Sequence, residues 1–269
     1  MLAAARNPFR ALALACAVLC GSAAVAGAAP RNDPAVKPPE PQRIELKTAD
    51  GQTIAGFWLD AHEAGRPAVL LLHNSGSDHF PYRALWERLL RLGVNVLAVD
   101  FRGHGASQRT TRDAYEKLAT RDQSVYREFI QDAQAGLDFL MREQKIPANR
   151  IAIVGGEVGA AVGFQALASN PKLRGLVALS PQTLSYGMDV MPWVAQFGKR
   201  PLLIIASKKL LHEGPQPIAD KLQKTATVQL EVFPGAEVRG VEMLQQPAGI
   251  ERLILAWTRE WLLGEKNPG

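Results

Sequence analysis

Six short and nearly continuous apolar runs constrain the fold of this chain more than any other feature. They are "AVLLLHN" at 68–74, "NVLAVDF" at 95–101, "RIAIVG" at 150–155, "GLVALS" at 175–180, "PLLIIAS" at 201–207 and "VQLEVF" at 228–233. Runs of this kind are typical of strands that are buried on both faces of a parallel sheet. Between them lie stretches with helical spacing, at 82–93, 124–144, 157–170, about 187–198 and 214–225, and a last one follows near 247–263. Alternating strands and helices predict an α/β protein, with one mostly parallel sheet and helices on both faces.

An opening hairpin extends this sheet to about eight strands. Residues 43–61, "RIELKTADGQTIAGFWLDA", indicate two strands around the turn Asp50-Gly51. The chain has 269 residues, of which 47% are hydrophobic and 21% charged, so it fits one large globular domain with a good core. We see no internal repeat and no second domain. We place the domain at 42–264 and a short C-terminal tail at 265–269.

The first residues predict a signal peptide, at 1–28. Arg6 and Arg10 form a basic start, and the apolar stretch "ALALACAVLCGSAAVA" is followed by small residues suited to cleavage near 26–28. The apolar stretch is shorter than the ~20 residues that span a bilayer. We therefore expect export, to a bacterial periplasm, with no stable membrane span after cleavage. An uncleaved membrane anchor is one alternative, and a lipoprotein modified at Cys16 or Cys20 is another.

Both cysteines lie in this leader, so the mature chain would contain no thiol, no disulfide and no thiolate metal site. Such a chain is compatible with an oxidising compartment. Residues 29–41 are rich in proline and polar residues and predict an extended linker. No cluster of Lys and Arg interleaves with aromatic residues, which argues against a nucleic-acid partner.

A strand, a tight glycine turn and a helix follow one another in "IAIVGGEVGAAVGFQALA", at 151–168. This order is typical of a nucleophile elbow, whose usual pattern is Gly-x-Ser-x-Gly. Gly155 and Gly159 occupy the flanking positions of the elbow, but Glu157 occupies the centre.

Four further stretches are informative beside the elbow. They are "LLLHNSGSD", "VLAVDFRGHGAS", "VALSPQTLSYG" and "PGAEVRGVEML". In this order and spacing, together with the elbow, they resemble the α/β-hydrolase superfamily over the whole mature chain. The sequence is most similar to the small bacterial dienelactone-hydrolase or serine-aminopeptidase type. The resemblance implies the α/β-hydrolase fold. Because the stretch 180–200 is short, we expect no large lid domain.

The resemblance also implies where the catalytic groups of a serine hydrolase would lie, in the order nucleophile, acid, histidine. The nucleophile position is Glu157. The acid position is Lys209, with Glu213 nearby as a possible substitute. The histidine position is Arg239, or Val238 if the register differs by one residue, and neither can act as a general base near neutral pH.

The same comparison places an oxyanion-hole-like set of amides at Asn74 or Ser75 and at Val158. Our hypothesis is that Glu157 and Arg239 form an ion pair where the family has a Ser–His hydrogen bond, with Lys209 as a possible second cation. The Glu157 carboxylate could also accept the amides of this hole. The alternative is that Glu157 points into solvent.

The histidines and the loop serines have simpler explanations. We expect His104 to support its turn and His73 to hydrogen-bond the backbone of its loop. The histidines lack the paired spacing of a metal site, so we expect no metal and no cofactor. Ser75 and Ser77 could be taken for nucleophiles, but the sequence shows no base for them.

Three functions therefore remain open. The first is an exported pseudo-hydrolase that binds a small molecule or a protein partner. The second is an active ester or amide hydrolase that uses Glu157 as nucleophile or as the base for a water. Burial would raise the pKa of Glu157 as this requires, whereas the expected cations would lower it. The third is a purely structural or assembly role.

Overall fold

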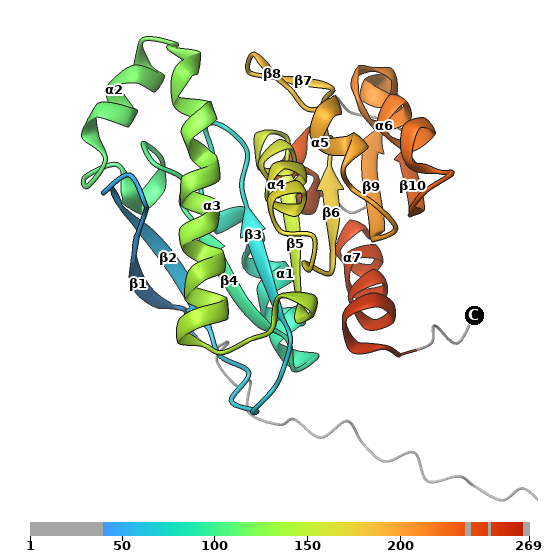
Figure 1. Cartoon of the computed structure of the whole chain (residues 1–269), viewed down its shortest axis with the longest axis horizontal. Helices are drawn as coiled ribbons and strands as arrows, with labels where there is room; N and C mark the ends of the chain where they lie inside the picture. The colour runs from blue at the N-terminus through green and yellow to red at the C-terminus, as the bar shows by residue number, and fades with distance from the viewer. Residues whose placement is uncertain (1–39, 235–237, 247–248, 266–269) are drawn as a thin grey trace, which may run out of the picture. The chain divides into compact units, whose positions relative to one another are not determined.

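A single eight-stranded sheet forms the centre of the computed structural model, which describes residues 40–234, 238–246 and 249–265 (Figure 1). Its strands are β1 (Gln42–Lys47), β2 (Thr53–Leu59), β3 (Ala68–Leu72), β4 (Asn95–Val99), β5 (Ile151–Gly156), β6 (Gly175–Leu179), β9 (Pro201–Ser207) and β10 (Thr227–Phe233). They lie in the order β1-β2-β4-β3-β5-β6-β9-β10. The pairs β1·β2 and β2·β4 are antiparallel, and the other five pairs are parallel. The predicted sheet, with its hairpin at one edge, is confirmed.

The strands are buried on both faces, as the apolar runs predict, and alternate residues contribute to two separate cores. In β3, Leu70 and Leu72 belong to one core cluster, and Val69 and Leu71 belong to the other. The first cluster is covered by α3 (Phe129–Asp138), α4 (Val158–Ser169) and α6 (Pro215–Leu222). The second is covered by α1 (Arg83–Arg91) and α7 (Ile250–Thr258). Helices therefore lie on both faces of the sheet (Figure 1).

Two predicted helices differ from their expected extent. The stretch 124–144 is divided into a 3₁₀ helix η3 (Gln123–Glu128), the α-helix α3 and a π-helical turn η4 (Phe139–Glu143). The prediction of a helix at about 187–198 is wrong in its first part. Leu184–Ser185 and Met188–Asp189 form a small antiparallel hairpin, β7–β8, and only α5 (Met191–Ala195) is helical.

The cause of that difference is a two-residue turn. Tyr186 and Gly187 both have positive φ, 46° and 76°, which suits a tight hairpin and is incompatible with a helix. Helix α2 (Arg112–Ala119) was not predicted, and it follows the loop after β4.

The segment between β6 and β9 contains only this hairpin and α5, so the expectation of no large lid domain is confirmed. The described residues fall within one compact unit, Pro38–Gly269. The predicted signal peptide and residues 29–39 of the predicted linker lie outside the described residues, as do residues 266–269 of the tail. Among the helices that are described, none has both the length and the apolar character needed to cross a bilayer.

Candidate functional site

Glu157 lies at a sharp turn between β5 and α4, with φ 49° and ψ −108°. Positive φ is rare for a residue with a side chain and is typical of strained functional turns. The flanking glycines are required by close packing. A Cβ on Gly155 would collide with the carbonyl oxygen of Gly159, and a Cβ on Gly159 would collide with that of Leu72. The turn thus has the geometry of a nucleophile elbow, with a glutamate at its tip.

Backbone hydrogen bonds hold this turn in place. The Glu157 N–H donates to the carbonyl of Leu179 at the end of β6, at 2.9 Å. The Glu157 carbonyl accepts from the N–H groups of Ala160 and Ala161, both at 3.1 Å. The position of the side chain at residue 157 is therefore fixed by the sheet and the helix together.

Arg239 lies between two carboxylates. Its Nη1 atom is 3.8 Å from Oε1 of Glu157 and 3.4 Å from Oε2 of Glu213. The Glu157 side chain is 11% exposed, whereas those of Arg239 and Glu213 are 39% and 47% exposed. The three residues form a row of acid, cation and acid. Its order in space matches that of nucleophile, histidine and acid in a serine hydrolase.

The alternative residues at these positions differ in their contacts. Of the two possible registers, Arg239 is the residue that reaches Glu157, and Val238 packs against the second core cluster. At the acid position, Glu213 is the residue that contacts Arg239. Lys209 is exposed on the 3₁₀ helix η6 (Lys208–Glu213).

Burial raises the pKa of the Glu157 carboxyl above its usual value. The charge of Arg239 and a hydrogen bond from Tyr186 act in the opposite direction, and the charges of Glu242 and Glu213 reinforce the rise. The pKa of Glu157 is raised overall, so burial outweighs the charge of Arg239, which was expected to lower this pKa. Within the described residues, the Glu157 carboxylate makes no capping hydrogen bond to the first turn of α4. The hypothesis that this carboxylate accepts the Val158 amide is therefore not supported.

A cluster of hydroxyl groups adjoins the elbow, and sequence reasoning missed it. The rings of Tyr126 and Tyr186 stack with centroids 4.0 Å apart. The hydroxyls of Ser75 and Tyr126 lie 2.7 Å apart, and Tyr186 hydrogen-bonds to both Ser75 and Glu157. Burial raises the pKa of Tyr186 to about 12, so its phenol remains protonated and acts as a donor. The one signal in the sequence was the dipeptide Tyr186-Gly187, which allows the tight turn that presents this ring.

Asn74 links the loop after β3 to the segment that carries Arg239. Its side-chain oxygen accepts from the Val241 N–H at 2.9 Å, and its amide nitrogen lies 3.0 Å from both carboxylate oxygens of Glu242. The side chain of Asn74 is therefore a structural link between residues far apart in sequence. Val158 follows Glu157 directly as the first residue of α4, and the assignment of Asn74, Ser75 and Val158 to an oxyanion-hole-like set stays a prediction.

The imidazole rings of His73 and His104 form hydrogen bonds with backbone groups. The Nε2 atom of His73 accepts from the Phe101 N–H at 3.0 Å and its Nδ1 atom contacts the Asn74 carbonyl at 2.7 Å. His104 accepts from the Gly76 N–H at 3.1 Å and contacts the Arg102 carbonyl at 3.0 Å. Burial lowers the pKa of His73 to about 4 and also lowers that of His104, so both rings are neutral supports for their loops.

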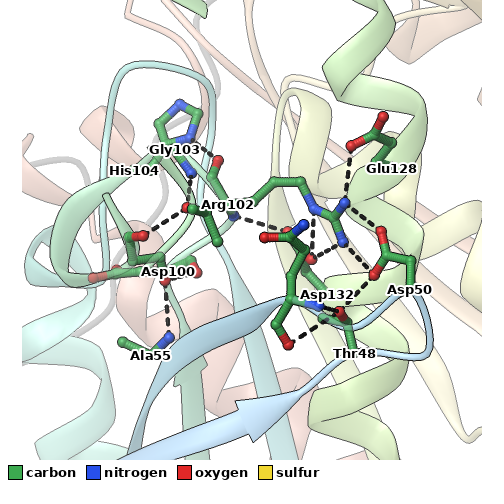
Figure 2. Close-up of polar contacts among 12 residues, drawn as sticks. Thr48, Asp50, Ala55, Asp100, Arg102, Gly103, His104, Glu128 and Asp132 are labelled. Atoms are coloured by element: carbon green, nitrogen blue, oxygen red, sulfur yellow. Dashed lines mark hydrogen bonds and ion pairs between the residues drawn. The ribbon is translucent and has the colours of Figure 1, made fainter. Parts of the chain in front are cut away.

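A buried cation organises the loop after β4, as Figure 2 shows. The Arg102 guanidinium donates to Asp132 at 2.7 Å, to Asp50 at 2.6 Å and to Glu128 at 2.9 Å. Arg102 is 1% exposed and Asp132 is fully buried, and burial raises the pKa of Asp132 to about 6. These contacts join the β1–β2 turn to α3, away from Glu157. In the part of the chain that is described, no group of three His, Cys, Asp or Glu side chains could hold a metal ion.

Comparison with known proteins gives a family for this chain. The model of a family described as serine aminopeptidase, S33, matches residues 63–229. An uncharacterized protein of Mycobacterium tuberculosis is 29% identical over 160 residues, which cover 58% of this chain and 52% of the relative. A thiohydrolase of Arthrinium phaeospermum is 25% identical over 224 residues, covering 79% of this chain and 65% of the relative. The chain thus spans less than two thirds of the length of each of these relatives.

Solved structures share the fold at lower identity. An esterase of Pyrococcus furiosus superposes with a TM-score of 0.64 and 23% identity, covering 83% of this chain and 93% of the esterase. The dienelactone hydrolase of Anabaena variabilis gives a TM-score of 0.62 and 17% identity, covering 85% of this chain and all of the enzyme. At these identities the similarity shows the α/β-hydrolase fold alone.

Proposed function

Because the chain belongs to the serine aminopeptidase (S33) family of α/β-hydrolases, we propose that it is an exported member that has lost serine-hydrolase chemistry and kept a ligand-binding role. The relatives at hand include a thiohydrolase and esterases, so the ancestral reaction would be cleavage of a thioester or an ester. The bound molecule would be a small ligand or a protein partner that leaves the site unchanged.

The observation that carries this proposal is the pairing of Glu157 with Arg239 at the elbow. A serine hydrolase needs a base that takes a proton from the nucleophile and returns it to the leaving group. Arginine remains protonated at all accessible pH values, so it cannot perform this exchange. The two buried histidines of the neighbouring loops, His73 and His104, are engaged by backbone groups and do not replace it.

Hydrolysis of short acyl esters tests the proposal directly. The full chain is assayed beside Glu157→Ala, and we expect neither protein to exceed the buffer rate. A buffer-subtracted turnover that disappears in Glu157→Ala would refute the loss of chemistry. It would favour the second function, an enzyme with a glutamate-centred site.

That second function has one specific observation in its favour, the raised pKa of Glu157. A carboxylate whose pKa is raised is a better general base for a water molecule. If Glu157 had this role, the rate would rise with pH as the carboxyl loses its proton and would then reach a plateau. Glu157→Gln would abolish this pH dependence together with the activity. A flat profile at the buffer rate would agree with the first function.

A further inference from the structure

A surface groove of about 560 Å³ adjoins the cluster around Glu157. It shares Ser75 and Tyr126 with that cluster. Its walls are the loop after β3, the loop after β4 and one side of α2. A cavity of this size suits a small organic ligand.

The charged side chains that line the groove indicate which class of ligand it could bind. Among the described residues that line it, Asp78 is the one with a carboxyl group, and none is a lysine or an arginine. His104 also lines the groove, but burial lowers its pKa and keeps it neutral. The Oδ1 atom of Asp78 accepts from the Phe80 N–H at 2.8 Å, and in the described part of the chain no lysine or arginine pairs with this carboxylate. The groove therefore offers an anionic group without a cationic partner.

The opposite wall is apolar and aromatic. It consists of Tyr115, Leu118 and Ala119 from α2. The Tyr115 residue is 45% exposed, which is unusual for a large apolar ring in the described structure. An aromatic face attracts cations as well as hydrocarbon, and an exposed apolar patch beside polar groups is typical of a binding site.

We propose that this groove binds a small organic cation, an ammonium group on an aromatic or alkyl body. The ammonium lies at Asp78 and the body lies against Tyr115 and Leu118. An anionic ligand has no cation to meet among the lining residues. The inference rests on the proposed function in one respect, because it treats the cation as a ligand that is bound and released without cleavage.

Three probes of one shape test this inference on the full chain by isothermal titration calorimetry. They are 3-phenylpropylammonium, 3-phenylpropan-1-ol and 3-phenylpropionate. A partly exposed ion pair changes affinity by roughly fivefold. We expect the ammonium to bind about fivefold more tightly than the alcohol, and the carboxylate to bind most weakly.

Two substitutions with the same change of charge localise the effect. Asp78→Asn keeps the acceptor for the Phe80 N–H, and we expect it to remove the preference for the ammonium probe. Asp113→Asn is the matched control, since Asp113 is an exposed acid in the first turn of α2 and does not line the groove. We expect that variant to retain the preference.

Equal binding of the three probes, no measurable binding of any probe at millimolar concentration, or an unchanged preference in Asp78→Asn would each overturn the inference. Ester turnover is measured in the same preparations. Turnover would overturn the proposed function whatever the probes show. A missing ammonium preference without turnover would overturn this inference alone.

Discussion

Glu157 keeps a backbone conformation that side chains rarely adopt, although it cannot act as the serine of a hydrolase does. In catalytic elbows the strained turn exposes the nucleophile, and such strain persists only when the surrounding structure enforces it. Here the enforcement comes from the hydrogen bond to Leu179 and from the close approach of Gly155 and Gly159 to neighbouring carbonyls. The turn is therefore a property of the scaffold and does not depend on which residue stands at its tip.

Backbone strain at this position predicts a difference between two truncations. Glu157→Ala and Glu157→Gly both remove the carboxylate, but only glycine adopts φ 49° and ψ −108° without steric cost. After allowing for the greater freedom of glycine in the unfolded chain, we expect Glu157→Gly to be more stable than Glu157→Ala by about 1 kcal/mol. Urea unfolding of the two variants measures this difference. An alanine variant as stable as the glycine variant would show that the turn relaxes.

The ion pair of Arg239 contributes less to stability than its position suggests. Arg239 is 39% exposed and also contacts Glu213, so removal of Glu157 does not leave a buried, unpaired cation. Half-exposed ion pairs are worth little, because water screens the charges. The pairing of Glu157 with Arg239 bears on the chemistry of the site more than on stability. It places the guanidinium of Arg239, which stays protonated, beside the residue at which a serine hydrolase needs a general base.

Individual elements of this fold are joined by side chains at the carboxyl ends of the strands. Arg102 follows β4 and joins the β1–β2 turn to α3 through three carboxylates (Figure 2). Asn74 follows β3 and joins that strand to η7 (Gly240–Gln245). Of the two residues, Asn74 is the one beside the elbow, since it binds the segment that follows Arg239.

The three partners of Arg102 differ in burial, which predicts unequal effects of their removal. Asp132 is fully buried, so Asp132→Ala leaves a buried cation partly uncompensated and should destabilise the protein by about 3–5 kcal/mol. The Asp50 side chain is 39% exposed, and Asp50→Ala should cost about 1 kcal/mol. Chemical denaturation of both variants gives the comparison. Equal losses would contradict the assignment of Asp132 as the principal partner.

The sequence predicted those elements whose signal is local. The parallel strands were found because each is a continuous apolar run, and the elbow was found because its two glycines have fixed spacing. The β7–β8 hairpin was missed because the stretch from about 187 has helical spacing, and that stretch begins within the turn Tyr186-Gly187. Helix α2 was missed because it buries only Ala114, which leaves no apolar stripe to detect.

Contacts between distant segments were not available from the sequence. The hydrogen bond from Asn74 to Glu242 joins residues 168 positions apart, and no sequence pattern in either segment predicts it. The contact of Glu213 with Arg239 likewise joins separate segments, the end of η6 and the residue before η7. The resemblance to a family predicted positions for the site, whereas the contact of Arg239 with Glu157 and the packing of Val238 against the core depend on the tertiary structure.

At the scale of the whole molecule, the described domain begins where the predicted linker ends, with β1 starting at Gln42. The predicted leader implies that the mature protein starts at Gly27 or Ala29. Intact-mass measurement of the protein recovered from a periplasmic extract tests this. A chain that retains Met1 in the membrane fraction would favour the anchor, and a lipid-modified cysteine would favour the lipoprotein.

We propose that the scaffold is intact and that two residues, Glu157 and Arg239, are responsible for the proposed loss of serine-hydrolase chemistry. The double variant Glu157→Ser/Arg239→His would then rebuild a nucleophile and a base, with Glu213 already beside position 239. The single variant Glu157→Ser is the control, because Arg239 cannot accept a proton from the new hydroxyl. General-base catalysis is worth at least about 100-fold, so the single variant should react at least that much more slowly.

The most direct measurement is the intact mass of each protein after incubation with a fluorophosphonate that modifies activated serines. We predict one adduct on the double variant, at position 157, slow labelling of Glu157→Ser, and no adduct on the natural chain. Labelling of the natural chain would show that an active nucleophile exists elsewhere. A double variant that stays unmodified would show that the scaffold no longer supports the chemistry of its family.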